Sequence, residues 1–211
     1  MCYVSIGWPH INAANGSAYM EYKGSKVMVA VYGPKDIQRR EDFTLDGFIK
    51  VDLSYCLFAK PVKRALPTDL KDIERYQATQ LTEALSSVVQ LKRYFLTQKI
   101  ISILNRYPKS QIDICVQVIE SHHDNETMAA MVTCAGCALA SAGLDMFGLV
   151  CAAGNDETFV ALMPELNQVT GLMATSEKDI NNVMGEARGI YPHIYQHFVQ
   201  WKRTYSIVSL I

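Results

Sequence analysis

Residues 16–34 read GSAYMEYKGSKVMVAVYGP, and this stretch decides the fold. Residues 17–22 alternate polar and apolar side chains, and residues 26–32 form a run typical of a β-strand. The Lys23-Gly24 step between them has the composition of a tight hairpin turn, and Gly33-Pro34 ends the second strand. The stretch therefore predicts an antiparallel β-hairpin.

Downstream of the hairpin, the periodicity of apolar residues predicts further elements. They are a strand at 48–56, a helix at 70–90, a strand at 111–119, a helix of small residues at 127–142, strands at 146–153, 159–163 and 166–173, and a long helix at 176–203. The first of these would extend the hairpin into an antiparallel meander. Strands followed by mixed strands and helices favour an α/β or α+β sandwich in a single domain.

The charge balance limits the kinds of partner that the chain suits. Its net charge is −1 over 211 residues, whereas a freestanding nucleic-acid binder usually carries a basic excess. Any RNA contact must then be local or shared with partner chains. We find no apolar run of about 18 residues and no signal-peptide pattern, so we expect no membrane span and six reduced cysteines inside a cell.

Four stretches carry a resemblance to a known family: GSAYMEYKGSKVMVAVYGP (16–34), YPKSQIDICVQVIE (107–120), CALASAGLDMFGLV (137–150) and VALMPELNQVTGL (160–172). In residue identity and spacing they resemble the RNase PH superfamily, and most of all the RNase PH-like subunits of the eukaryotic RNA exosome ring. The tail, where VALMPELNQVTGLM is followed by a helix containing IYPHIYQHFV, is most similar to the subfamily named for messenger-RNA transport regulation.

The resemblance implies a fold, an assembly and a location. The fold would be an α/β (α+β) RNase PH-like ββαβα sandwich of the ribosomal protein S5 domain 2-like type, spanning 16–207 after a short N-terminal arm at 1–15. Six such domains form a ring around an RNA channel, with S1/KH cap subunits on one face. The implied partners are other RNase PH-like ring subunits, the caps and single-stranded RNA, with no cofactor, metal or membrane. The implied location is the nucleus, nucleolus and cytoplasm.

The resemblance also points to a degenerate phosphate site. Active members cleave RNA by phosphorolysis and hold phosphate with a Gly-Ser-Arg triplet before the small-residue helix. The matching positions here are Glu126, Thr127 and Met128. We expect the Glu126 carboxylate to repel phosphate and Met128 to supply no charge, while Thr127 retains a single hydrogen-bond donor.

Two further departures affect the same site. The acidic stretch that carries the catalytic aspartate in active relatives is shortened here to GNDETF (154–159), where neither Asp156 nor Glu157 matches cleanly. Active relatives also have a pair of basic residues before the first helix, and the matching positions here are Asp72 and Ile73. We therefore predict that the chain has no catalytic residue. We predict instead a structural subunit that helps to form the RNA channel for 3′-5′ RNA processing and degradation, including ribosomal RNA processing.

Basic side chains in two segments are the candidates for RNA-phosphate contacts: Lys60, Lys63, Arg64, Arg39 and Arg40. A channel that tracks single strands needs such positive groups. The resemblance favours the first three facing the channel, whereas the last two suit a neighbouring subunit equally well. Ordinary solvated loops explain both clusters as readily.

Alternatives of other classes remain open at this point. One is an active phosphate-dependent 3′-5′ exoribonuclease with a phosphate site rebuilt from other residues; another is a standalone RNA-binding module. Cys134 and Cys137 have the spacing of half a zinc site, but a buried structural role fits better. Residues 92–105 resemble an insertion that either extends the first helix or marks a divergent member.

Overall fold

The computed structural model describes residues 4–7, 11–36, 48–59, 67–89, 92–97, 100–105, 110–174 and 179–208. Their elements, in chain order, are β1 (Val4–Gly7), β2 (Gly16–Tyr22), β3 (Ser25–Asp36), β4 (Phe48–Tyr55), α1 (Pro67–Ser86), β5 (Lys92–Thr97), β6 (Ile100–Asn105), β7 (Ser110–Glu120), α2 (Asp124–Ser141), β8 (Cys151–Gly154), β9 (Thr158–Met163), β10 (Gln168–Ala174) and α3 (Ile180–Val208).

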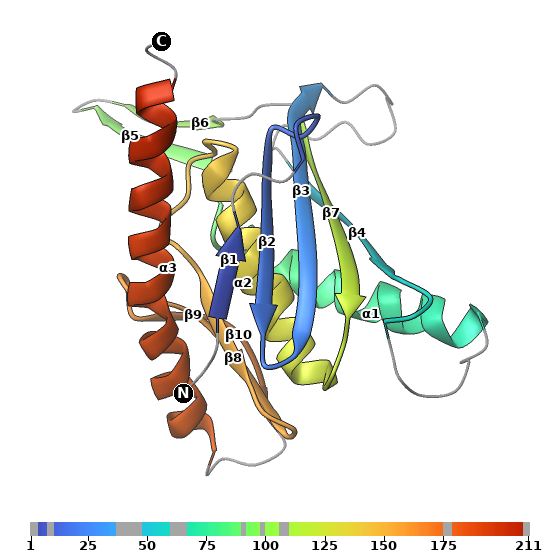
Figure 1. The fold of residues 1–211 in the computed structure, drawn as a ribbon. Helices are drawn as coiled ribbons and strands as arrows, with labels where there is room; N and C mark the ends of the chain where they lie inside the picture. The colour runs from blue at the N-terminus through green and yellow to red at the C-terminus, as the bar shows by residue number, and fades with distance from the viewer. Residues whose placement is uncertain are drawn as a thin grey trace.

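The elements stack in layers around α2 (Figure 1). A five-stranded sheet has the order β1-β2-β3-β7-β4, and a three-stranded sheet has the order β10-β9-β8. Helix α2 packs against β2 and β3 on one side and against β8 and β9 on the other, while α3 covers β8 and β9. This mixed sandwich of helices and sheets is the α/β class that the sequence predicts.

The predicted hairpin is present as β2 and β3. Tyr22 pairs with Ser25, so that Lys23 and Gly24 alone form the turn. Both turn residues have positive φ, 45° at Lys23 and 83° at Gly24. That geometry matches the right-handed twist of the flanking strands, and a glycine is needed at one of the two positions.

The predicted antiparallel meander is wrong. Strand β4 does not pair with β3 but runs parallel to β7, with Ile49 opposite Ile112. Strand β7 lies between them and pairs antiparallel with β3. Parallel strands need a long crossover connection, and here α1 lies in the segment that joins β4 to β7. The crossover therefore places β4 at the edge of the sheet.

Helix α2 is buried along most of its length, as its small residues predict. A Cβ atom on Gly16 of β2 would lie 2.4 Å from the backbone oxygen of Ala138, and one on Gly136 would lie 2.4 Å from Val150 Cγ1. The helix begins at Asp124 rather than at 127, because His123 already has the extended conformation of an N-cap.

Three other segments differ from expectation. Residues 92–105, expected as an insertion in or after the first helix, contain the antiparallel pair β5 and β6. Strand β8 begins at Cys151 rather than 146. Within the expected N-terminal arm, Val4–Gly7 pairs with β2 and adds a strand to the main sheet. None of the described helices is long and apolar enough to cross a membrane.

Candidate phosphate site at the start of α2

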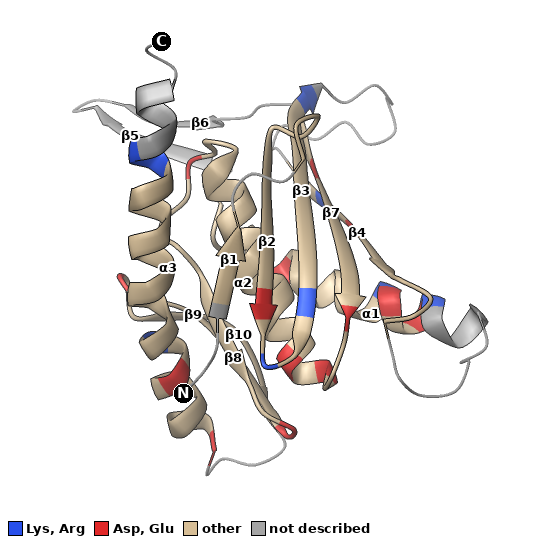
Figure 2. Cartoon of the chain, viewed as in Figure 1, with Lys and Arg blue, Asp and Glu red and all other residues tan. Residues whose placement is uncertain are grey.

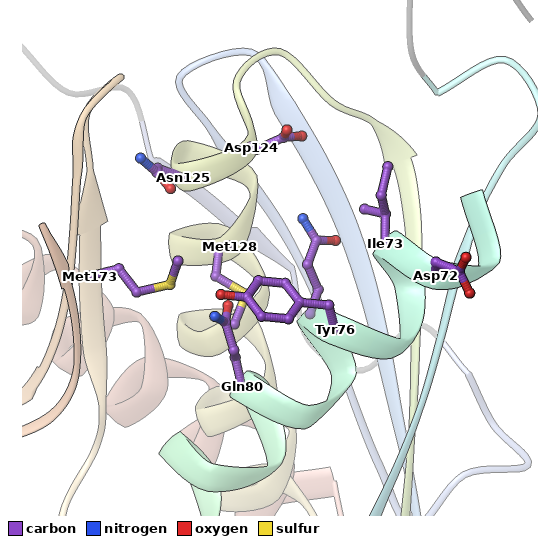
Figure 3. Close-up of a pocket in the computed structure, with 9 residues that line it drawn as sticks. Asp72, Ile73, Tyr76, Gln80, Asp124, Asn125, Met128 and Met173 are labelled. Carbon is purple, nitrogen blue, oxygen red and sulfur yellow. The ribbon is translucent and has the colours of Figure 1, made fainter. Parts of the chain in front are cut away.

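A pocket of about 350 Å³ lies where α1, α2 and β10 meet. Figure 3 shows Tyr76 of α1 lying across the gap beside Met128 of α2, with Met173 reaching in from β10. The residues that line the pocket are Asp72, Ile73, Tyr76, Gln77, Gln80, Asp124, Asn125, Met128 and Met173. Its position at the start of the small-residue helix is the one that the resemblance assigns to phosphate.

Of the three predicted degenerate-site residues, Met128 alone lines this pocket. Met128 is 3% exposed and brings a thioether to the position that the resemblance assigns to a guanidinium in active relatives. A thioether sulfur is a weak acceptor with no donor, so it offers nothing to an anion.

Thr127 does not retain the free donor that was expected. Its hydroxyl donates to the backbone oxygen of His123 at 2.7 Å and lies 2.9 Å from Ser121 Oγ and 3.1 Å from Ser25 Oγ. A hydroxyl has one proton, so the two serines act as donors to it. The side chain is fully buried and serves this internal network.

Glu126 is also placed differently from the prediction. It faces Lys23, whose Nζ lies 3.9 Å from Oε1, and it does not line the pocket. Burial raises the pKa of its carboxyl, and the attraction of Lys23 only partly opposes that effect. The carboxylates that do line the pocket are Asp72 and Asp124, so repulsion of an anion there comes from these two residues.

The short joint between β8 and β9 is fastened to the first turn of α2. Asn125 Nδ2 donates to the backbone oxygens of Asn155 at 3.1 Å and Asp156 at 3.0 Å. A Cβ atom on Gly154 would lie 2.4 Å from the backbone oxygen of Asn125. The Asp156 carboxylate lies 3.4 Å from His123 Nδ1 and does not reach the pocket.

Lys23, which sequence reasoning missed, connects the hairpin turn to this region. Its ammonium lies 2.9 Å from Glu186 Oε1 of α3 and donates at 3.0 Å to the backbone oxygen of Gly154 and to Asn155 Oδ1. Its place in the predicted Lys23-Gly24 turn was the available signal in the sequence, but only the fold reveals its partners.

The charged residues that line the pocket, Asp72 and Asp124, are both acidic. None of the nine lining residues is Lys, Arg or His. Figure 2 shows acidic residues at the first turn of α2, which are Asp124 and Glu126, while the described Lys and Arg residues are scattered over separate elements. Carboxylates at a helix N-terminus complement its dipole, so the feature that attracts phosphate elsewhere is already balanced here.

The remaining predicted sites divide between undescribed and buried residues. The five RNA-binding candidates Arg39, Arg40, Lys60, Lys63 and Arg64 lie outside the described residues, so their role stays a prediction. Cys134 and Cys137 are both buried, and burial raises the pKa of each thiol. Among the described residues no group of His, Cys, Asp and Glu is placed to hold a metal.

Comparisons with known proteins show what the whole chain is similar to. Residues 3–145 match the family model described as "3' exoribonuclease family, domain 1". Human "Exosome complex component MTR3" is 30% identical over 92% of this chain and 80% of its own length. "Exosome complex component Rrp41" of Thermoplasma acidophilum is 30% identical over 72% of this chain, and the matched region covers 56% of that protein's length.

Similarity to a solved structure supports the fold alone. The crystal structure of rice Rrp46 superposes with a TM-score of 0.64 at 18% identity, covering 93% of this chain and 92% of that one. The family model matches more than half of the chain, and the human relative covers most of it. The chain belongs to the RNase PH 3′ exoribonuclease family.

Proposed function

We propose that this chain is a non-catalytic structural subunit of an RNA exosome core ring, where it helps to form the channel for 3′-5′ RNA processing and degradation. One observation carries the proposal: the pocket at the start of α2 has Met128 at the arginine position and no basic side chain among its lining residues. The fold of the proposed subunit follows from family membership, and its proposed inactivity follows from the residues that line this pocket.

The physical case against phosphorolysis rests on charge and on hydrogen bonding. Inorganic phosphate needs charge-assisted donors, and a guanidinium provides two in parallel. Here Asp72 and Asp124 oppose an anion, and the Thr127 hydroxyl donates to His123 instead. The acid expected near the leaving oxygen is also displaced, since Asp156 pairs with His123 outside the pocket.

The case for a ring subunit rests on the relatives. Proteins named as exosome complex components from human and fission yeast are 30% and 31% identical to this chain. We infer that its partners are other RNase PH-like ring subunits, S1/KH caps and single-stranded RNA in the shared channel. We also infer that it works in the nucleus, nucleolus and cytoplasm. Lys60, Lys63 and Arg64 are the proposed channel-facing cations.

The test of inactivity is release of ADP from poly(A) in the presence of orthophosphate. We expect none from the full chain, and in an assembled ring we expect any activity to be unchanged by Asp156→Asn, since neighbouring subunits would supply it. Phosphate-dependent ADP release that Asp156→Asn lowers would support the competing function, an active phosphorolytic 3′-5′ exoribonuclease.

A further inference from the structure

The pocket at the start of α2 has the properties of a binding site for a cationic side chain. Ile73, Met128 and Met173 contribute apolar side chains to its lining, and Asp72 and Asp124 lie at its outer edge, here called the rim (Figure 3). A pocket of about 350 Å³ is at the low end of the roughly 300–1,000 Å³ typical of ligand sites, so it suits a side chain better than a nucleotide.

Tyr76 narrows the chemistry further. This aromatic residue of α1 lines the pocket, and yet it is 60% exposed to solvent. An exposed ring face beside carboxylates favours a guanidinium, which stacks on aromatic rings and pairs with carboxylates in a planar fork. Thioethers such as Met128 and Met173 adapt their shape to an aliphatic stem.

We propose that this pocket binds an arginine side chain of a partner polypeptide. The inference rests on the proposed loss of the phosphate site, because a working phosphate cradle would repel the same arginine. Charge complementarity selects a basic protein segment over RNA, since the phosphates of RNA would meet the carboxylates of Asp72 and Asp124.

An internal competitor is present at the rim. The guanidinium of Arg75 lies 3.9 Å from Asp72, one helical turn along α1, and both side chains are strongly exposed. An exposed pair of this kind contributes little, so an incoming arginine is able to replace it. Arg75→Gln should therefore strengthen binding of a cationic partner, about twofold.

The methionines provide a direct readout by NMR. With methyl-labelled methionine in the full chain, the signals of Met128 and Met173 report on the pocket. Met28, on the opposite face of the main sheet, serves as an internal control. The probe is the peptide acetyl-Gly-Arg-Gly-Arg-Gly-amide, and its neutral counterpart carries citrulline in place of arginine. We expect the arginine peptide to shift Met128 and Met173 but not Met28, and the citrulline peptide to bind about tenfold more weakly.

Substitutions test the assignment residue by residue. We expect Tyr76→Ala to weaken binding about threefold and the double change Asp72→Asn with Asp124→Asn about tenfold. Glu83→Gln removes one negative charge, half of the charge that the double change removes, from an exposed position of α1 outside the pocket, and it should leave affinity unchanged.

Different failures have different meanings. Absence of a peptide-induced shift at Met128 and Met173, or an equal loss of affinity in Glu83→Gln, would overturn the arginine site while leaving the ring role intact. A shift of Met128 by orthophosphate in place of the peptide would overturn both this inference and the proposed inactivity.

Discussion

The first turn of α2 and the middle of the same helix differ in what constrains them. In the middle, Gly136 touches Val150, and Thr133 Oγ1 accepts a 2.9 Å hydrogen bond from the backbone of Ala152. At the first turn, Asp124 is exposed and Met128 borders a pocket. Packing fixes residue size in the middle, whereas only chemistry fixes the identity of a pocket residue. The fold of a family can therefore be kept while the residues that line one of its pockets change.

The largest expected effect comes from the packed part of α2. Gly16→Ala would place a Cβ atom 2.4 Å from Ala138 O and Ala142 N, and both neighbours are backbone atoms that are unable to rotate away. We expect a loss of about 3 kcal/mol in the free energy of unfolding, measured by urea denaturation.

The matched control for this substitution lies on α3. Gly185→Ala meets nothing within 4 Å of the added carbon, and a helix favours alanine over glycine. This variant should gain up to about 1 kcal/mol. Equal and small effects of the two substitutions would show that the contact between β2 and α2 is not tight.

The hydroxyl network at the first turn should matter next. Thr127→Val removes the partner of Ser121 and Ser25 in a buried site, so we expect a cost of about 1–3 kcal/mol in the free energy of unfolding. Thr79→Val removes a bond of the same kind, to the backbone oxygen of Arg75, at an exposed position and should change little. A free energy of unfolding unchanged in Thr127→Val would mean that the hydroxyl is available to a ligand after all.

A smaller effect, with a pH dependence, is expected at Glu126. Below the ordinary pKa of a carboxyl, the folded and unfolded chains both hold the proton. As the pH rises, the unfolded chain loses it first, because burial raises the pKa in the folded state, so ionisation then disfavours folding.

Glu126→Gln removes this unfavourable ionisation, and Oε2 of Glu126 has no hydrogen-bond partner in the described part of the chain. The variant should therefore be more stable than the wild type at pH 7, by under about 1 kcal/mol, and the gain should disappear as the pH falls toward 4. Thermal unfolding across this pH range measures it. A loss of stability at pH 7 would indicate that the pairing of Glu126 with Lys23 outweighs its burial.

The smallest expected effect is on activity. Met128→Arg places a guanidinium at the position that the resemblance assigns to arginine, but it leaves Asp72 and Asp124 at the rim and the Thr127 hydroxyl bonded to His123. We expect no phosphate-dependent ADP release from poly(A) by this variant. A gain of activity from this one change would show that the arginine alone separates this chain from an active enzyme.

The sequence predicts those parts of the fold that depend on local chemistry. The hairpin of β2 and β3 follows from the Lys23-Gly24 turn, and the buried helix follows from its small residues. The pairing of β4 was not predictable in the same way, because a parallel partner is set by a crossover of many residues. The hairpin at 92–105 likewise has no distinctive turn signal in the sequence.

The candidate site shows the same division. The family resemblance predicts Glu126, Thr127 and Met128 at the site, and of these Met128 lines the pocket whereas Glu126 does not. The reason is helical phase: α2 begins at Asp124, so Asn125 and Met128 share the pocket side with Asp124, while Glu126 turns toward Lys23. A shift of three residues in a predicted helix start changes which side chains face a pocket.

The central claim, that this chain is a structural subunit of an exosome ring, is tested most directly by co-expressing the full chain with the other ring subunits and determining the mass of the product after size-exclusion chromatography. We expect the chain to enter a stable ring-sized complex in stoichiometric amount. A chain that elutes as a stable monomer and never joins the ring would contradict it.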